Sequence, residues 1–598
     1  MKLRWALGVF AGIILALLAF YPQWNLERIR GAEFNGVFAT CDLDEMAYTA
    51  YLQALIDGRP RKNDPYTGRD HRVHDQQSES LFSIQFFPAY LAAIPARIVG
   101  YSASEMMPVL SVISGFLTAL ALFWLIRSIT GDDLFSFAGT LTVMTASAAV
   151  IGIGAINGLF DGGVAYPFFP YMRRYIPSLA FPFLFAFFAC LWNGLNSEDR
   201  TRQVLFGISA AVCFSALVFS YFYIWTAAAG VFGCLCVSVL LLGGKERRQD
   251  TVFLLLTGAL CALTLIPYAI LLSDRNKLMD KAQLLVITRQ LDLFRGVEII
   301  GYCVIVFAAI ILWRKRGEQA QRKLSFVIAL AASPAVVFNQ QLVTGRSLQP
   351  FHYEFYVINY VVLLAAVLLF SMTWKWLSER SRNAASAAAI ILSVLAIAWG
   401  YFEASETTRF WDQVNVRRDE AMPVNLRLRE LAEDGSTGST LNLESLQADS
   451  QPTVAPQAVL WARHQHTFAG LESWEENKLR YFQLLYFSDR DAEWLRQSLT
   501  ACRDIEACMA LFGWDRFNAR LSANARPLTK IEIDEEVRRF AEFSDLFTKD
   551  QALNLELSYL VTYVDDESQF KNVDRWFERG MGEVLGKYVL YPLSVRSQ

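Results

Sequence analysis

The sequence is poor in charge and in histidine for its length. Only 19% of its 598 residues are charged, five are histidine, and the formal net charge is −3. It has no run of basic residues interleaved with aromatics, no Cys-x-x-Cys or His-Glu-x-x-His pattern, and no glycine-rich loop at the start of a helix. These absences argue against a nucleic-acid surface, against the common zinc motifs and against a nucleotide-type phosphate loop.

Apolar residues dominate instead. Hydrophobic residues make up 54% of the chain and aromatic residues 14%, and the mean hydropathy is +0.27. These values are typical of a chain that lies mostly in lipid. The first apolar segment, Trp5 to Tyr21, follows Lys2 and Arg4 like the start of a signal peptide. Because no small-residue cleavage site precedes Pro22, we expect an uncleaved anchor.

Further apolar stretches are long enough to span about 30 Å of hydrocarbon. They lie near 106–126, 133–154, 176–193, 203–221, 224–242, 251–272, 296–313, 324–338, 356–374 and 384–402. Together with the first segment they predict about eleven transmembrane helices.

Positive charge alternates between the predicted connections. Lys and Arg cluster at 245–248, 314–323 and 375–382, on the side that the basic N-terminus shares. Short cytoplasmic loops are enriched in these residues. We therefore expect a cytoplasmic N-terminus, with the loop 22–105 and everything after about 403 outside.

The two outer segments differ in composition. The loop 22–105 contains the apolar run 81–99, which two prolines interrupt and which suits an interfacial helix. After about residue 403 the chain turns soluble, and runs such as 557–564 are typical of buried strands. The predicted fold class is a polytopic α-helical membrane protein, with a membrane domain over 1–402 and an extracytoplasmic α/β domain over 403–598.

Three cysteines fall on the predicted outer side: Cys41, Cys502 and Cys508. Cys502 and Cys508 could close a small disulfide loop in an oxidising compartment. Two helical turns could equally hold them apart.

An acidic cluster, Asp42-Leu43-Asp44-Glu45, follows the first span on the outer side. Two carboxylates in an Asp-x-Asp pattern suit a divalent cation such as Mg or Mn. Alternatively, Asp42 caps a helix that begins near Asp44, and Glu45 interacts favourably with the dipole of that helix. Both interpretations stay open on the residues alone.

These features together resemble the GT-C superfamily of integral-membrane glycosyltransferases, and in particular bacterial members without assigned substrates. The resemblance rests on the first span, the acidic start of the outer loop followed by Tyr48 and Tyr51, the interfacial helices, the many spans and the soluble outer domain. Asp64-Pro65-Tyr66 and the segment 339–353 also look like family sequence.

The resemblance implies an activity and a place. A GT-C enzyme would move a sugar from a polyprenyl-phosphate carrier to a glycan, lipid or protein acceptor, with inversion at the transferred carbon. It would lie in the bacterial inner membrane and act at the periplasmic face, in cell-envelope glycan or glycolipid assembly.

The resemblance also implies a catalytic base. In this family an acidic residue at the start of the first outer loop takes the acceptor proton. Asp44 is the first choice because Asp44-Glu45 resembles an acidic pair in several relatives, Asp42 is the second, and Glu45 completes the predicted catalytic set. Some GT-C enzymes use a divalent cation and others do not, so Asp42 and Asp44 stay open as metal ligands.

Several arginines fall on predicted outer connections, where Lys and Arg should be scarce. A polyprenyl phosphate presents an anion at that depth, and arginine holds phosphate oxygens by paired hydrogen bonds. We predict donor-phosphate contacts from Arg174 and Arg346, whose neighbours are apolar or aromatic, from the adjacent Arg173, and from His352 in the family-like segment. The alternative is contact with anionic lipid headgroups or acidic loop residues.

The other histidines form two pairs, His71 with His74 and His464 with His466. Neither pair has a third metal ligand at a typical spacing, so a hydrogen-bonding role is favoured. The aromatic run 166–171 could line a groove for the isoprenoid chain, although an interfacial aromatic belt is favoured.

Two other classes of function compete with a transferase: a transporter or flippase of lipid-linked saccharides, and a non-catalytic membrane scaffold. A transporter should carry ionisable residues within its spans, and the predicted spans contain almost none. The carboxylates gather at the outer surface instead, which favours an enzyme.

Overall fold

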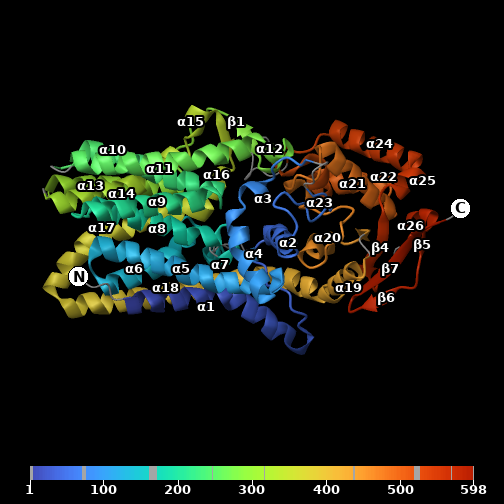
Figure 1. Cartoon of the computed structure of the whole chain (residues 1–598), viewed down its shortest axis with the longest axis horizontal. Helices are drawn as coiled ribbons and strands as arrows, with labels where there is room; N and C mark the ends of the chain where they lie inside the picture. The colour runs from blue at the N-terminus through green and yellow to red at the C-terminus, as the bar shows by residue number, and fades with distance from the viewer. Residues whose placement is uncertain are drawn as a thin grey trace.

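The computed structural model describes residues 5–70, 76–160, 172–244, 247–314, 317–435, 438–516, 525–566 and 569–596. Within these residues, ten helices are long and apolar enough to cross a membrane. They form an elongated bundle, and a mixed region of helices and strands lies at one end of it (Figure 1). The predicted fold class, a polytopic helical protein with a C-terminal α/β region, is confirmed.

The ten candidate spans contain α1 (Trp5–Arg30), α5 (Ala103–Thr130), α6 (Asp133–Val150), α8 (Phe181–Leu195), α9 (Arg200–Val218), α10 (Phe222–Leu242), α11 (Arg247–Ser273), α13 (Gly296–Arg314), α17 (Asn359–Arg380) and α18 (Arg382–Glu420). The remaining predicted span corresponds to α14 (Glu318–Val337), which lies in the same bundle against α10 and α13. Because α14 begins with polar residues, its apolar part is too short to cross about 30 Å of hydrocarbon alone.

Sequence signals set the ends of these helices. At the start of α5, Ser102 accepts a hydrogen bond from the Glu105 backbone N–H, and the Glu105 carboxylate accepts one from the Ser102 backbone. The same helix ends at Gly131, whose φ of 76° favours glycine. Small residues then let helices approach closely: a Cβ on Gly115 of α5 would lie 3.0 Å from the Leu15 carbonyl oxygen of α1.

The loop after α1 folds into α2 (Asp44–Ile56), α3 (Leu81–Ile84) and α4 (Phe87–Val99). Almost every residue of α2 is buried. In contrast, α4 buries its alanines and exposes Leu91, Ile94 and Ile98. One apolar exposed face fits the interfacial helix that the sequence predicts.

The C-terminal region begins beyond α18, a single helix of 39 residues that continues through the predicted boundary at 402/403. After α19 (Met422–Glu433), a five-stranded sheet contains β3 (Ser439–Asn442), β4 (Leu557–Tyr563), β7 (Tyr588–Val595) and β5 (Phe577–Arg579) in that order, with β6 (Glu583–Leu585) also pairing with β7. β3 is parallel to β4, and the other pairs are antiparallel.

Helices cover this sheet: α20 (Ser445–Ser450), α21 (Trp474–Phe487), α22 (Ala492–Leu499), α23 (Ile505–Phe512), α24 (Lys530–Leu546), α25 (Lys549–Leu553) and α26 (Lys571–Trp576). Cys502 and Cys508, at the start of α23, form a disulfide with their Cα atoms 5.8 Å apart. Of the two alternatives for these cysteines, the structure contains the closed loop.

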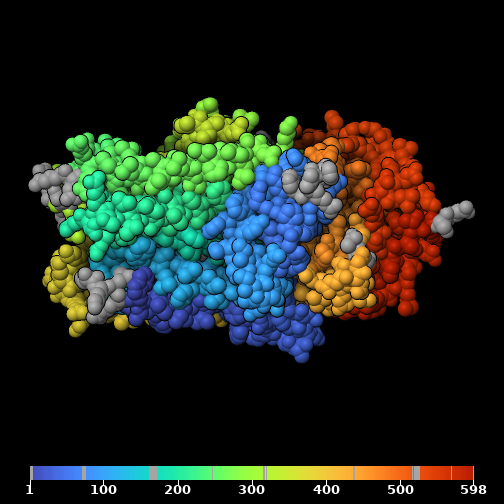
Figure 2. Space-filling model, viewed as in Figure 1, coloured from blue at the N-terminus to red at the C-terminus, as the bar shows by residue number. Residues whose placement is uncertain are grey.

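The C-terminal region is docked on the outer loop through an apolar contact. The Phe468 ring stacks on Phe82, with centroids 4.3 Å apart, and packs against Tyr51 and Tyr66. The Val459 backbone N–H donates to the Tyr66 carbonyl at 2.8 Å. On the visible face, the surface of the outer loop continues into that of the C-terminal region (Figure 2).

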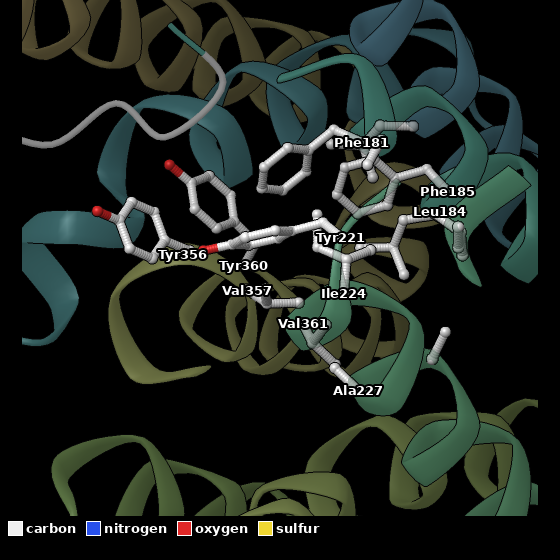
Figure 3. Packing of buried hydrophobic residues seen from close by; sticks show 14 of the residues in the cluster. Phe181, Leu184, Phe185, Tyr221, Ile224, Ala227, Tyr356, Val357, Tyr360 and Val361 are labelled. Carbon is white, nitrogen blue, oxygen red and sulfur yellow. The ribbon is translucent and has the colours of Figure 1, made fainter. Parts of the chain in front are cut away.

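Two short strands from different connections, one before α13 and one before α17, pair with each other. β1 (Leu285–Ile287) and β2 (Arg346–Leu348) pair antiparallel, after which α16 (Pro350–Tyr353) and a π-helical turn, η4 (Glu354–Ile358), lead into α17. Figure 3 shows Tyr356 and Tyr360 packed with Tyr221 beside an apolar layer from α8, α10 and α17, with their three hydroxyl oxygens on the same side.

Candidate functional site

The acidic cluster lies at the N-terminus of α2. The Asp42 carboxylate accepts the Asp44 backbone N–H at 2.9 Å and so pairs the first N–H of α2, although the residue that directly precedes the helix is Leu43. Glu45 turns back and accepts hydrogen bonds from the Cys41 backbone N–H, at 2.7 Å, and the Thr40 hydroxyl, at 2.8 Å. This local bonding leaves Asp44 as the outward-facing member: its side chain is 51% exposed, against 7% for Asp42 and 0% for Glu45.

Glu45 and Arg174 form a buried ion pair. Glu45 Oε1 accepts from Arg174 Nε at 3.0 Å and from the Arg174 backbone N–H at 2.6 Å, while Oε2 accepts from Nη2 at 3.1 Å. Arg174 also donates to Ser111 Oγ at 2.9 Å and to the Ala39 carbonyl. Protein groups therefore engage every nitrogen of this guanidinium, and the pair ties α2 to α5.

Arg173 faces the other two carboxylates. It donates to Asp44, and its Nε lies 3.4 Å from Asp42 Oδ2. The guanidinium carbon lies 5.2 Å from the ring centroid of Tyr48 and 5.3 Å from that of Tyr356. The side chain is 4% exposed. Among the residues that the structure describes, its Nε and Nη1 make no hydrogen bond of ordinary geometry, although the Tyr221 hydroxyl lies near the guanidinium. Arg173 is thus a buried cation with donor capacity to spare.

His352 reaches the same place from α16. Its ring stacks between Tyr223, at 4.7 Å, and Tyr356, at 5.1 Å, so Arg173 and His352 share the Tyr356 ring. Within the described ranges, His352 Nδ1 and the Tyr223 hydroxyl are buried without a hydrogen-bond partner. Buried polar groups normally have partners, so these two atoms are available to contact a bound group.

Two further residues of the site, His464 and Asp449, come from the C-terminal region. His464 Nε2 lies 3.3 Å from Asp44 Oδ1. Its Nδ1 lies 3.1 Å from Asp449 Oδ2, an ion-pair distance without hydrogen-bond geometry among the described residues. Asp449 also accepts the His464 backbone N–H, at 3.1 Å, and pairs with Arg463 at 3.0 Å. From the sequence alone, Asp449 has no assigned role and His464 is considered only together with His466, because no local pattern joins Asp449 or His464 to Asp44.

The electrostatics of these groups are coupled. Burial by itself would raise the pKa of Asp44, but Arg173 and the hydrogen bond from His464 hold that pKa well below its usual range. Burial by itself would lower the pKa of His464, but Asp449 and Asp44 outweigh it and raise the pKa to about 9. At neutral pH Asp44 is therefore a carboxylate between two cations.

The metal interpretation of Asp42 and Asp44 does not fit this geometry. Both carboxylates face the Arg173 guanidinium, which takes the position that a divalent cation would need. In the described part of the chain, no group of three or more His, Cys, Asp or Glu side chains is arranged to hold a metal ion.

Other predicted residues lie apart from this cluster. Arg346 is exposed on β2, opposite Ile287 of β1, and none of the described contacts joins it to the carboxylates. His466 packs against Trp474, with ring centroids 5.3 Å apart. His71, His74 and the aromatic run 166–171 lie outside the described residues.

Two cavities also lie elsewhere. One, of about 810 Å³, is lined by the end of α18, by α21, α22 and α23, and by the residues that follow β3 and β4. The other, of about 680 Å³, lies between α4 and α19. Neither is lined by the acidic cluster.

Comparison with known proteins adds little. No protein-family model matches the chain, and no curated protein does. The chain is similar to the oligosaccharyltransferase of Archaeoglobus fulgidus, solved in complex with Zn and sulfate, at 12% identity and a TM-score of 0.48, over 98% of this chain and 73% of that chain. It is also similar to ArnT from Cupriavidus metallidurans bound to undecaprenyl phosphate, at 12% identity and a TM-score of 0.40, over 98% of this chain and 97% of that chain. At this level neither likeness establishes a family or an activity.

Proposed function

We propose that the chain is an inverting glycosyltransferase that moves a sugar from a polyprenyl-phosphate carrier to a glycan, lipid or protein acceptor. The observation that carries the proposal is the pairing of a half-exposed carboxylate, Asp44, with a buried arginine, Arg173, whose Nη1 makes no hydrogen bond to the described residues. Such a site has a base and an anion-binding group side by side, and glycosyl transfer from a phosphate needs both.

In the proposed reaction, Asp44 accepts the proton of the acceptor hydroxyl as the hydroxyl oxygen attacks the anomeric carbon. The bond between that carbon and the carrier phosphate oxygen breaks, and its electron pair leaves with the phosphate. Arg173 stabilises the charge that develops on the phosphate. A single displacement of this kind inverts the configuration at the transferred carbon.

The other predicted residues take narrower roles in this proposal. His352 shares the Tyr356 ring with Arg173 and supplies a second donor to the phosphate. Arg174 holds Glu45 and so fixes the first turn of α2, which is why we assign the phosphate contact to Arg173 first. Arg346, exposed on β2, stays a prediction as a contact for the carrier.

We place the reaction on the periplasmic face of a bacterial inner membrane, in cell-envelope assembly. The start of α1 lies toward the end of the bundle opposite the C-terminal region (Figure 1). Loops rich in Lys and Arg favour the cytoplasmic side, and the basic clusters of this chain share the N-terminal side in the predicted topology. The acidic cluster, next to the C-terminal region, then faces the periplasm.

The test is lipid-linked glycan profiling of a deletion strain, complemented with wild-type protein or with Asp44→Asn. We expect a polyprenyl-linked sugar to accumulate in the deletion strain, wild type to clear it, and Asp44→Asn to be expressed without clearing it. A flippase would instead leave the donor on the cytoplasmic leaflet, where externally added periodate cannot oxidise it. A scaffold would be complemented fully by Asp44→Asn.

A further inference from the structure

The buried chain of polar contacts that ends on Asp44 begins in the C-terminal region. Asp449 is 1% exposed and the His464 side chain 9%, and both nitrogens of this imidazole lie close to a carboxylate. Asp449 is held in turn by Arg463 and by the His464 backbone. The chain Arg463, Asp449, His464, Asp44 thus crosses from α20 and the loop after it to the first turn of α2.

Docking alone does not require these charges. Phe468 already packs against three aromatic rings of the outer loop, and Val459 bonds to the Tyr66 backbone. Burying a histidine and an aspartate costs free energy unless each is well paired, and an apolar pair of similar size would dock equally well. The contact of His464 with Asp44, the half-exposed carboxylate of the acidic cluster, explains why His464 and Asp449 lie at this position.

We propose that His464, held by Asp449, is a positioning residue for the base Asp44, so that the C-terminal region completes the catalytic centre. The inference rests on the proposed transferase function. His464 lies by Oδ1 of Asp44, and Arg173 donates to Oδ2, so each oxygen of the carboxylate has its own donor. When the donor phosphate draws Arg173 away, His464 alone keeps the carboxylate oriented toward the acceptor hydroxyl.

The groups that face His464 are Asp44, Asp449, Arg463 and His466. His466 provides a matched control because it is also a buried histidine, lies two residues away, and contacts Trp474 rather than Asp44. A substitution at His466 therefore tests what a general disturbance of this loop does.

The experiment measures turnover of the polyprenyl-linked sugar that accumulates in the deletion strain, using full-length protein in membranes. We expect His464→Gln to lower kcat about 10- to 100-fold and to change the apparent KM for the donor less than about 3-fold, because misplacing a catalytic group by about 1 Å costs up to 10²-fold. Asp449→Asn should show the same split with a smaller loss, and His466→Gln should keep kcat within about 3-fold of wild type.

A double variant separates positioning from a merely structural role. If His464 acts only through Asp44, Asp44→Asn with His464→Gln turns over no more slowly than Asp44→Asn alone. Losses that multiply, or full turnover in His464→Gln, would overturn the inference. If His464→Gln does not fold, Asp449→Asn, which leaves the imidazole in place, is tested in the same way and by the same criteria. Absence of turnover by wild type would refute the proposed function itself. Full turnover in Asp44→Asn would refute the assignment of the base, and an inactive Asp44→Asn beside a fully active His464→Gln refutes only the role of His464.

Discussion

The three carboxylates of the acidic cluster should respond differently to loss of charge. Asp44 is half exposed between Arg173 and His464, Asp42 accepts a backbone N–H of its own helix, and Glu45 is fully buried against Arg174. Replacement of each by its amide keeps size nearly constant, so the differences report charge and hydrogen bonding.

Asp44→Asn should lose activity and keep its fold. Removing the positioned base costs on the order of 10²–10⁴ in turnover. The loss of stability should be only about 0.2–1 kcal/mol, the range for ion pairs that remain accessible to solvent. Arg173 keeps Asp42 at 3.4 Å and the rings of Tyr48 and Tyr356, so its buried charge is not left alone.

Asp42→Asn and Glu45→Gln should affect activity and stability differently from Asp44→Asn. Asparagine caps a helix about as well as aspartate, so Asp42→Asn should keep the cap and most of the activity. Glu45→Gln removes one partner of a buried pair, which costs about 3–5 kcal/mol because Arg174 is then buried without a countercharge. Its main defect should be low melting temperature and low yield.

The assay pairs turnover of the accumulating donor, measured by mass spectrometry of lipid extracts, with thermal melting of the purified protein in detergent. Among folded variants, Asp44→Asn should lose far more turnover than Asp42→Asn. Glu45→Gln should lose more stability than either of them. A folded Asp42→Asn that is as inactive as Asp44→Asn would refute the assignment of the base, and an unchanged melting temperature in Glu45→Gln would refute the structural role of its pair.

Two other predictions concern protonation and topology. Burial outweighs an opposing hydrogen bond with Ser445 and raises the pKa of Glu506 to about 7. The stability that comes from the protonated carboxyl is therefore present below pH 4.5 and is lost as pH rises through 7. Glu506→Gln should therefore melt like wild type at low pH and progressively higher than wild type above about pH 5, and equal melting at pH 8 would contradict this. For topology, a cysteine at exposed Gln551 should react with an impermeant maleimide in intact spheroplasts and one at Gln319 only after lysis; the reverse pattern would move the acidic cluster to the cytoplasm.

Local patterns allowed much of the fold to be predicted. Apolar run lengths located the ten candidate spans, and the composition change after about 403 located the C-terminal region. The run at 324–338 is shorter than the other predicted spans, and α14, which contains it, is not among the ten candidate spans. The continuity of α18 to Glu420 was also missed, since apolar and charged helical segments look separate in a sequence although one backbone helix joins them.

In the candidate site, too, local sequence identifies some residues, whereas the contacts of the others depend on tertiary packing. Asp42, Asp44 and Glu45 could be selected because they share the first turn of one helix. From the sequence alone, Arg174 ranks above Arg173 because of its apolar and aromatic neighbours. Adjacent residues point in different directions, however, and only packing decides which one meets Glu45. His464 lies far along the chain from Asp44, and their contact depends on how the C-terminal region docks.

The shared position of Arg173 leads to a last prediction, about donor affinity. In the structure without ligand Arg173 is bound to Asp44, so a donor phosphate must compete with this carboxylate for the guanidinium. Asp44→Asn removes the competitor and should bind undecaprenyl phosphate about 1.5- to 5-fold more tightly than wild type, which corresponds to about 0.2–1 kcal/mol for a solvent-accessible pair. Arg173→Gln should bind it at least about 10-fold more weakly, because a charge-assisted bond to phosphate is lost. Binding of undecaprenyl phosphate to purified protein, followed by native mass spectrometry at pH 7, measures both. Weaker binding by a folded Asp44→Asn would mean that Arg173 and Asp44 bind the donor together rather than compete, and would remove the basis for assigning the phosphate to Arg173.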